Sequence, residues 1–254
     1  SFTKARRNEL ALADNDVHFN TEGRKEHAKQ VAKHIMIAVS GEAAAAPRTV
    51  LPKVLLIGDS ISMGYTMFVG GALDDVARVE RINANGQHTE TGLKRIDRWL
   101  GDTDWKVIHF NWGLWDLCYR HPDSKVQGNR DKLNGTITTT LEQYEKNLDQ
   151  LVARLKKTKA TLIWAHTTLV PEKEAGRFVG DDKKYNEVAA RIMKKYGVRI
   201  NDLNTLTSGF PLQLFTGAGN VHYKWEGYKR LGEQVSREIR VALKGVSESA
   251  ESGR

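Results

Sequence analysis

A serine stands where a buried strand gives way to a helix, a position that suits a nucleophile. The segment KVLLIGDS (53–60) is a short apolar run typical of a buried strand, and it ends in Gly-Asp-Ser. A helical pattern follows, so Ser60 is predicted near a helix N-terminus, whose free N–H groups can stabilise an oxyanion. A serine in this place can also serve only as a helix cap. Nucleophilic catalysis additionally needs a base that removes the hydroxyl proton.

Two histidines lie in matching sequence contexts, and each is a candidate for that base. His222 occurs in GNVHYKWEG (219–227), and His18 occurs in NDVHFNTEG (15–23). The match continues at a constant offset, without a gap, into the amphipathic stretch that follows each histidine. The sequence therefore carries the same loop and helix twice, and it leaves open which histidine faces Ser60.

The elements that position these residues alternate regularly from residue 53 onward. Short apolar runs predict five strands, over 53–60, 79–82, 106–111, 160–166 and 198–202. Helical periodicity predicts helices over 63–77, 89–100, 137–157, 181–196 and 225–243. Such alternation predicts a three-layer α/β/α sandwich with a five-stranded parallel sheet. Ligands bind beyond the carboxyl ends of such strands, and this is where the sequence places Ser60, Asn111, His166 and Asp202.

Four motifs, in order, resemble those of the SGNH (GDSL-type) hydrolase superfamily. They are IGDSISMGY (57–65), INANGQHTETGLKRIDRWLG (82–101), HFNWGLWDL (109–117) and NVHY (220–223), which resemble blocks I, II, III and V. Block III looks similar to an uncharacterised, esterase-like subgroup that reads FNWGLHDL. The resemblance covers about 50–245 and implies the flavodoxin-like SGNH fold. It also implies that Ser60 is the nucleophile, His222 the base, and the backbone N–H groups of Ser60 and Gly86, with Asn111, the oxyanion hole.

Two positions depart from the pattern of that family. Trp115 stands where block III usually has an asparagine that donates to the oxyanion, and Gly219 stands where an aspartate usually orients the histidine. His222 then works in a Ser-His dyad or takes its orienting acid from Asp202 or Asp116. In the N-terminal copy, Asp16 lies beside His18 and is the corresponding acid for that alternative base.

Aromatic and histidine side chains near the motifs are candidates for the rim of a substrate site. Trp112, Trp115 and Trp225 can form an aromatic wall for a sugar ring, although core packing is the safer default for any one of them. His166 follows a strand and can contact substrate or serve as a structural histidine. The remaining histidines show no metal-ligand spacing, so we predict no metal and no cofactor.

The segments outside the main domain suggest a duplication. Residues 1–38 resemble a second block V loop and helix, 39–49 have the composition of a linker, 50–245 form the SGNH-like domain, and 246–254 form a polar tail. Residues 1–38 are then either the end of a preceding domain in a tandem array or an element exchanged with a neighbouring chain in a homodimer.

Composition limits the classes of partner. The net charge of +8 comes from basic residues scattered over helical stretches, without a zinc-finger or RNA-recognition motif, so we predict no nucleic-acid partner. The charge favours acidic partners such as anionic polysaccharide. No apolar run is long enough to span a bilayer, and the N-terminus lacks the apolar core of a signal peptide. The sequence indicates a soluble chain, does not assign a compartment, and leaves export open.

The expected activity is hydrolysis of a small acyl ester by Ser60 and His222. An acetyl group on a small molecule or carbohydrate is the substrate class that the resemblance implies. The departures at Trp115 and Gly219 motivate the alternative, a catalytically degenerate domain that binds a glycan or a protein partner.

Overall fold

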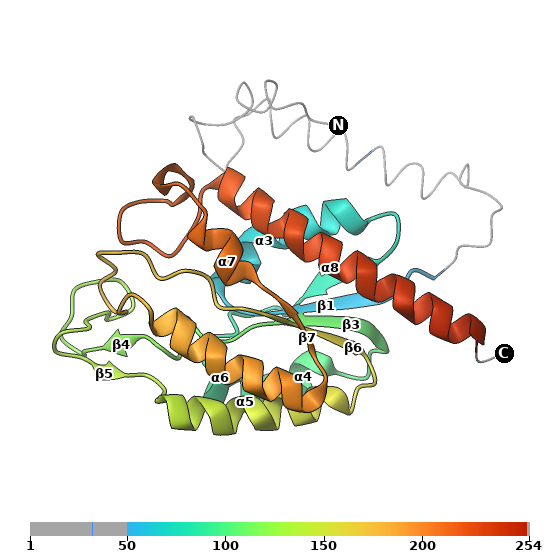
Figure 1. Cartoon of the computed structure of the whole chain (residues 1–254), viewed down its shortest axis with the longest axis horizontal. Helices are drawn as coiled ribbons and strands as arrows, with labels where there is room; N and C mark the ends of the chain where they lie inside the picture. Colours follow the sequence, from blue (N-terminus) through green and yellow to red (C-terminus); the bar gives the residue numbers. More distant parts are fainter. Residues whose placement is uncertain (1–31, 33–49, 253–254) are drawn as a thin grey trace. The chain divides into compact units, whose positions relative to one another are not determined.

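Five parallel strands form the central sheet in the order β2-β1-β3-β6-β7 (Figure 1). The computed structural model describes residue 32 and residues 50–252, and from Leu51 onward the chain forms one unit. The strands of the sheet are β1 (Lys53–Ile57), β2 (Arg78–Arg81), β3 (Trp105–Phe110), β6 (Thr161–Ala165) and β7 (Arg199–Asn201). All four pairings are parallel. The predicted parallel α/β sandwich is therefore confirmed.

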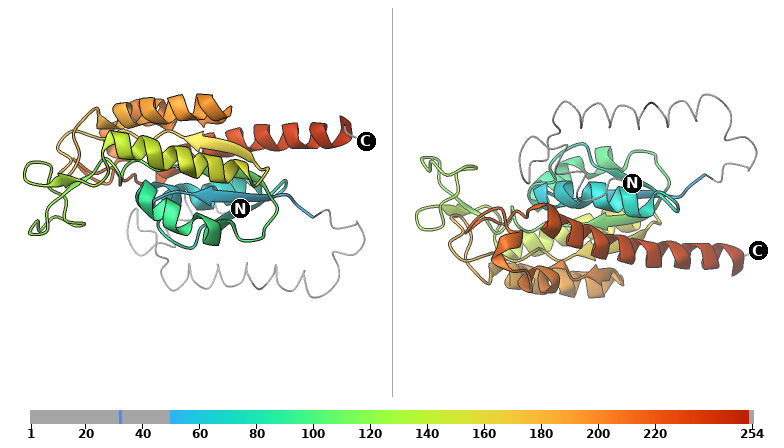
Figure 2. Two further views of the ribbon diagram at one scale, coloured as in Figure 1. Left: turned by 90° about the horizontal axis from the view of Figure 1, so that it is seen from below. Right: turned by 90° about the horizontal axis from the view of Figure 1, so that it is seen from above.

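Helices cover both faces of this sheet (Figures 1 and 2). They are α3 (Ser60–Leu73), α4 (Thr89–Leu100), α5 (Leu141–Lys156), α6 (Asp181–Tyr196), α7 (Leu203–Ser208), the 3-10 helix η1 (Leu212–Leu214) and α8 (Trp225–Ser252). On one face α3 packs against α8, and on the other α4 packs against α5 and α5 against α6. The three inner strands β1, β3 and β6 are buried on both faces, which explains why they read as nearly continuous apolar runs, whereas the edge strands β2 and β7 are shorter and partly exposed.

The α3–α8 contact is close because each helix has a glycine at the crossing. A Cβ atom on Gly64 would lie 2.1 Å from the ring of Tyr228, and one on Gly232 would lie 2.5 Å from the Cβ of Phe68. The absence of a side chain at these two positions lets the helix backbones approach. This contact fixes α3, and therefore Ser60 at its N-terminus, against the helix that follows His222.

The strand order creates the crevice in which the site lies. The chain moves from β1 outward to β2 at one edge, then returns to β3 on the other side of β1 and continues through β6 to β7. Ligand crevices of open parallel sheets form at such a reversal, beyond the carboxyl ends of the strands. Ser60 lies three residues after the end of β1, and Asn111 directly follows β3, so a polar residue stands just beyond each of the two strands that flank the reversal.

Several features of the described chain differ from the predicted elements, and the short helices α7 and η1 are among those that were not predicted. A hairpin of β4 (Tyr119–Arg120) and β5 (Thr136–Ile137) lies between β3 and α5, and its two-residue strands are too short to carry a periodic signal. Helix α3 begins at residue 60 and not at residue 63, because its cap precedes the serine. The described part of the chain contains no helix long and apolar enough to cross a membrane.

The predicted second block V copy (1–38) and linker (39–49) lie outside the described residues, Ala32 excepted. Their arrangement therefore stays a prediction, as does the identity of any partner that they contact. At the other end, α8 continues to Ser252, so most of the predicted polar tail (246–254) has a helical backbone.

Candidate active site

Ser60 is the first residue of α3, and the residue before it caps the helix. The Oδ1 of Asp59 accepts the backbone N–H of Ile61 at 2.9 Å, and Asp59 is 3% exposed. Burial raises the pKa of the Asp59 carboxyl, an effect opposed by the Ile61 hydrogen bond and by Arg177. Because Asp59 performs the capping, the hydroxyl of Ser60 does not have to cap the helix. That hydroxyl points instead to a histidine.

Ser60, His222 and Asn220 form a chain of hydrogen bonds. The Oγ of Ser60 lies 2.8 Å from Nε2 of His222, and Nδ1 of the same ring lies 2.8 Å from Oδ1 of Asn220. The same Oδ1 accepts the backbone N–H of His222 at 3.0 Å. A backbone N–H can only donate, so this atom is the amide oxygen and Nδ1 must carry the ring proton. Nε2 is then unprotonated, and it accepts the hydroxyl proton of Ser60.

The backbone at Gly219 explains why no aspartate orients His222 from the position usual in the family. Gly219 has φ = 70°, in the left-handed region that strongly favours glycine. A Cβ atom there would lie 2.4 Å from the carbonyl oxygen of Lys173, a contact that no side chain can tolerate without movement of the backbone. The next residue, Asn220, is the one whose side chain reaches Nδ1.

The surroundings of His222 keep its ring neutral. Burial lowers the pKa of His222, and the nearby guanidinium groups of Arg177 and Arg130 lower it further, while Glu174 acts in the opposite direction. A base with a lowered pKa stays unprotonated, and therefore able to accept a proton, below the ordinary histidine pKa of 6.5.

Two of the three predicted oxyanion donors are engaged in hydrogen bonds within the protein. The N–H of Gly86 donates to the carbonyl oxygen of Gly58 at 2.9 Å. The side-chain amide of Asn111 donates to the carbonyl oxygen of Ala165 at 2.7 Å. The N–H of Ser60 lies in the first turn of α3, where helical N–H groups have no intrahelical acceptor. Of the three predicted donors, only that of Ser60 is uncommitted.

Asn85 is a donor that the sequence did not single out. It lines the same cleft as Ser60 and His222. Its Oδ1 accepts the backbone N–H of Gln87 at 2.9 Å, which leaves the amide NH₂ as the end available to a ligand. Its neighbour Gly86 carried the family motif, and no local pattern distinguishes Asn85 from the other polar residues of that loop.

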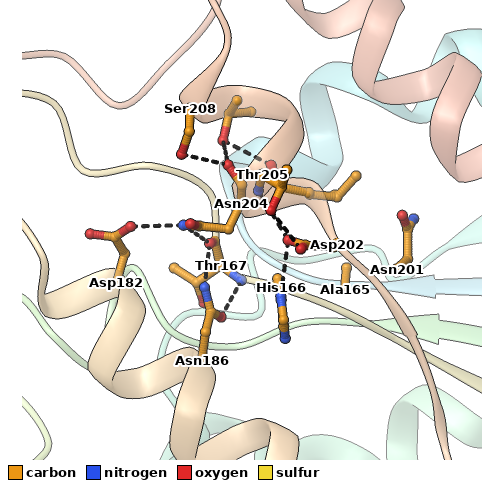
Figure 3. A network of polar contacts seen from close by, with 12 residues as sticks. Ala165, His166, Thr167, Asp182, Asn186, Asn201, Asp202, Asn204, Thr205 and Ser208 are labelled. Carbon is orange, nitrogen blue, oxygen red and sulfur yellow. Dashed lines mark hydrogen bonds and ion pairs between the residues drawn. The ribbon is translucent and has the colours of Figure 1, made fainter.

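Neither described aspartate proposed as the orienting acid contacts His222. Asp202 caps α7 by accepting from Thr205, and it also accepts from Nδ1 of His166 at 3.0 Å (Figure 3). Burial raises the pKa of Asp202, but the hydrogen bonds from Thr205 and His166 bring it below its usual value. Because its oxygens serve α7 and His166, Asp202 belongs to a separate histidine–carboxylate pair. Asp16 and His18 lie outside the described residues.

Asp116 has a structural role at the opposite helical layer. Its Oδ1 accepts both the N–H of Thr89, at 2.9 Å, and the hydroxyl of Thr89, at 2.6 Å, at the start of α4. The side chain is fully buried, and burial raises the pKa of Asp116 to about 7 even though the Thr89 hydrogen bonds lower it.

The loop after β6 is fixed by a polar network beside the His166–Asp202 pair (Figure 3). Thr167 donates its N–H to Asn186 at 2.8 Å, and its carbonyl oxygen accepts from the amides of Asn186 and Asn204. His166 lines a small cavity of about 10 Å³, close to the volume that one water molecule needs. His166 lines this cavity and is not among the residues that line the cleft with Ser60, so the predicted contact of His166 with substrate stays a prediction.

The cleft itself has a volume of about 270 Å³ and combines catalytic candidates with charge. Three arginines and one tryptophan line it together with Ser60 and His222. Besides Asn85, the lining residues are Asp59, Ser60, Leu114, Trp115, Arg120, Gln127, Gly128, Arg130, Arg177, Asn220, Val221 and His222. The arginines at 120 and 130 come from the unpredicted hairpin region, so only the fold reveals that they belong to the site.

Two of the three predicted rim tryptophans pack elsewhere. Trp112 is 1% exposed and donates its indole N–H to the carbonyl oxygen of Gly86 at 3.2 Å, so it is a core residue behind the block II loop. Trp225 packs edge-on against Phe68, with ring centroids 4.5 Å apart. Trp115 lines the cleft, as predicted, and stacks on Arg120.

The described residues contain no group of three or more His, Cys, Asp or Glu side chains that could hold a metal ion. The polar side chains that line the cleft carry a hydroxyl, an imidazole, amides, guanidinium groups and the buried carboxyl of Asp59. Such a set can activate a nucleophile and bind an oxyanion without a bound ion.

Comparison with known proteins gives a family and a fold. Residues 56–230 match the model of the GDSL-like Lipase/Acylhydrolase family. The lipase/acylhydrolase from Enterococcus faecalis superposes with a TM-score of 0.60 at 21% identity, covering 74% of this chain and 95% of that one. The acetyl xylan esterase AlAXEase gives 0.59 at 16% identity, with coverages of 74% and 99%.

A catalytic mutant of Axe2, an acetylxylan esterase from Geobacillus stearothermophilus, gives a TM-score of 0.58 at 17% identity, with coverages of 74% and 94%. None of the curated proteins gives a significant match. At these identities the structural likeness establishes the shared fold.

Proposed function

The chain belongs to the GDSL-like lipase/acylhydrolase family, and we propose that it is a serine esterase that removes a small acyl group, such as acetyl, from a carbohydrate or other alcohol. The observation that carries the proposal is the hydrogen-bonded chain from Ser60 through His222 to Asn220. It places a hydroxyl on an unprotonated imidazole nitrogen at the wall of an open cleft.

In the acylation step, Oγ of Ser60 attacks the acyl carbonyl carbon while Nε2 of His222 takes the hydroxyl proton. The imidazolium that forms keeps its second proton on Nδ1, which donates a hydrogen bond to Oδ1 of Asn220, and it then gives the Nε2 proton to the departing alcohol. Water repeats the sequence on the acyl-serine, releasing the acid and restoring the hydroxyl. Asn220 acts as a positioning residue, because its oxygen fixes the tautomer and the ring orientation.

The oxyanion of the tetrahedral intermediate needs donors on the side of the cleft that faces the carbonyl oxygen. We assign the first of these to the N–H of Ser60 and the second to the amide NH₂ of Asn85. The N–H of Gly86 can contribute only by sharing its hydrogen bond with Gly58. Loss of one such donor from an oxyanion hole costs about 3–4 kcal/mol of transition-state stabilisation, so this hole predicts a slower enzyme than one with three donors.

We propose acetyl as the acyl group of the substrate because two structural neighbours are acetyl xylan esterases. Their low identity transfers the fold and leaves the substrate of this chain as a proposal. Support from the molecule itself comes from the cleft, whose 270 Å³ accommodates a sugar ring bearing a small acyl group.

The test is release of acetate from p-nitrophenyl acetate and from acetylated xylooligosaccharides by the purified chain. Ser60→Ala should reduce kcat at least about 10³-fold, as removal of a catalytic serine does in other hydrolases. Ser208→Ala is the matched control, because that hydroxyl bonds only within α7 and should leave kcat unchanged. Hydrolysis that survives Ser60→Ala at the wild-type rate would refute the proposal.

A second function, a binding module without turnover, is favoured by one observation. Both Gly86 N–H and the Asn111 amide are engaged in hydrogen bonds within the protein, so two of the donors expected for an oxyanion hole are occupied. On this account the cleft binds an acylated glycan that Ser60→Ala binds equally well. No Ser60-dependent hydrolysis across a panel of esters would then accompany measurable binding in calorimetry.

A further inference from the structure

The cleft beside Ser60 holds more positive charge than its surroundings neutralise. Arg120, Arg130 and Arg177 all line it. Glu174, whose side chain is fully buried, pairs with two of them through the same oxygen, at 2.5 Å from Arg130 Nη1 and 2.8 Å from Arg177 Nη1. Glu174 lies outside the lining, and the one acid among the lining residues is Asp59, whose carboxyl has its pKa raised by burial. One guanidinium group is left without a carboxylate.

That group is Arg120, and it is held in a fixed position. Its guanidinium carbon lies 4.6 Å from the centroid of the Trp115 ring, and its Nη1 donates to the carbonyl oxygen of Gly128. Within the described part of the chain, Arg120 makes no ion pair. A guanidinium group carries five N–H donors, so most of its hydrogen-bonding capacity is available to a ligand in the cleft.

The hairpin keeps this charge in an electrostatically unfavourable place. Arg120 lies opposite Arg130 in an antiparallel bridge, and like charges directly opposite one another destabilise such a pair. The connecting loop adopts left-handed backbone at two successive residues, Gly128 (φ = 74°) and Asn129 (φ = 55°). A Cβ atom on Gly128 would lie 3.0 Å from Nη1 of Arg120, so this turn is shaped around the guanidinium group.

Partial burial makes the positive charge of Arg120 still less favourable, and an anion bound beside it would offset this cost. Burial lowers the pKa of Arg120, as do Arg177 and Arg130 nearby, while Cys118 and Glu174 act in the opposite direction. A cation that is half removed from water, stacked on an indole and opposed by other cations is stabilised when an anion binds to it. The planar fork of arginine matches the two oxygens of a carboxylate or a sulfate.

We propose that Arg120 binds an anionic group, a carboxylate or a sulfate, on the ester that Ser60 attacks, so that the preferred substrate is an acylated acidic carbohydrate. This inference rests on the proposed esterase function and narrows its substrate class. Trp115 stands at the position where the family usually has an asparagine, and the guanidinium group of Arg120 stacks over its ring. The position thus contributes to substrate binding in place of a donor to the oxyanion.

The experiment compares two substrates that differ only in charge. The first is an O-acetylated methyl glucuronoside, and the second is the same compound with its carboxylate converted to a methyl ester. Acetate release gives kcat/KM for each in wild type, Arg120→Gln and Arg120→Lys. Arg237→Gln is the matched control, since it removes one exposed arginine from α8 and lies outside the cleft lining. Circular dichroism checks that each variant is folded.

At low ionic strength the wild-type protein should favour the charged substrate by about tenfold or more, the effect of one charge-assisted hydrogen-bonded pair. The preference should fall close to one in Arg120→Gln, take an intermediate value in Arg120→Lys, and persist in Arg237→Gln. It should also decrease as salt is added. An equal rate for the two substrates in wild type, or an unchanged preference in Arg120→Gln, would overturn the inference while leaving the esterase activity standing.

Further substrates locate the charge and identify its chemistry. An acetylated sugar sulfate replaces the glucuronoside, which separates sulfate from carboxylate recognition. p-Nitrophenyl hydrogen succinate, compared with p-nitrophenyl acetate, places the charge on the acyl group. A preference confined to the succinate would mean that the protein recognises an anionic group on the acyl part of the ester and not on the alcohol. It would overturn the assignment of an acidic carbohydrate as substrate.

Binding keeps the inference testable if no ester is hydrolysed. In that case the esterase proposal fails, and calorimetric titration of the acetylated glucuronoside into Ser60→Ala and Ser60→Ala/Arg120→Gln decides about the anion site. An affinity at least about tenfold lower in the double variant supports the site. Equal affinity in the two, or no binding to either, refutes it.

Discussion

His222 and His166 both lie beyond the carboxyl edge of the sheet, and each has what the other lacks. His222 has the Ser60 hydroxyl at Nε2, and an amide oxygen in place of a carboxylate at Nδ1. His166 has the Asp202 carboxylate at Nδ1, whereas its Nε2 is buried without a hydrogen-bond partner among the described residues. A search for a histidine–carboxylate pair alone would select His166, the ring that contacts no nucleophile.

The difference separates two roles that a carboxylate usually performs together. Any acceptor oxygen at Nδ1 fixes the tautomer and leaves Nε2 free to take a proton, and Asn220 does this. A carboxylate also stabilises the imidazolium that forms after proton transfer. At His222 the ring is therefore oriented by Asn220, but no negative charge stabilises its imidazolium form. The nearby Arg177 and Arg130 disfavour that form further. The predictions below test how far orientation alone is sufficient.

The largest expected effect distinguishes the two histidines directly. His222→Ala should lower kcat for an acetyl ester by about 10²–10⁴, the usual contribution of a general base. His166→Ala should lower it by less than about tenfold, because its ring is hydrogen-bonded to Asp202 and does not contact Ser60. Steady-state kinetics on both variants checks this. A loss in His166→Ala as large as that in His222→Ala would show that the pair with the carboxylate takes part in the reaction.

An intermediate effect is expected at Asn220. Asn220→Ala should lower kcat by about ten- to a hundredfold, because Nδ1 loses the acceptor that fixes its proton. Asn220→Asp supplies a carboxylate, which favours the imidazolium form and so raises the pKa of His222. The acidic limb of the kcat/KM profile lies below pH 6.5 in wild type, and it should move to higher pH in Asn220→Asp.

The pH profiles of the wild type and of Asn220→Asp, measured on one ester, provide the test. At pH values well above the limb, where both rings are neutral before reaction, Asn220→Asp should be at least as fast as wild type. A limb that stays in place would mean that the activity does not report the protonation of His222.

The smallest effect concerns the backbone that excludes an aspartate from position 219. Gly219→Ala should lower the free energy of unfolding by about 1–3 kcal/mol, because the new side chain meets Lys173 and the backbone is left-handed there. Gly217→Ala is the control in the same loop, since a Cβ atom at Gly217 has no neighbour within 4 Å. Urea denaturation of both variants measures the difference. Equal stabilities would mean that the loop rearranges easily and that its geometry does not prevent an aspartate.

The sequence predicted the sheet because its inner strands are buried on both faces. β1, β3 and β6 are apolar nearly throughout, and each strand was predicted to within a few residues of its observed bounds. The hairpin of β4 and β5 escaped prediction because two-residue strands have no period, and their position depends on contacts with distant segments. Arg120 and Arg130, two of the arginines that line the cleft, lie in this hairpin or its loop.

The pairing of side chains within the site depended on tertiary structure. The sequence placed Asp202, Asp116 and Asn111 near strand or motif ends, but none of them bonds to Ser60 or His222. Asp202 accepts from α7 and His166, Asp116 accepts from Thr89, and Asn111 donates to Ala165. Position along the chain fixes which end of the sheet a residue reaches. It does not fix which of several polar neighbours a side chain contacts, because that choice depends on helix caps and loop conformations formed elsewhere.

The sequence by itself determined the fold class and the family, and it named Ser60 and His222 as the candidate pair. Ordered motifs and apolar periodicity are local properties that the chain carries without folding. Tertiary structure alone decided that Asn220 orients the histidine and that Arg120 and Trp115 meet at the cleft. The residues of each contact are near one another in the chain, but their side chains meet only in one conformation of the loops that carry them. That conformation includes left-handed backbone at Gly219 and Gly128, and it is set only when the helices and loops have packed around the sheet.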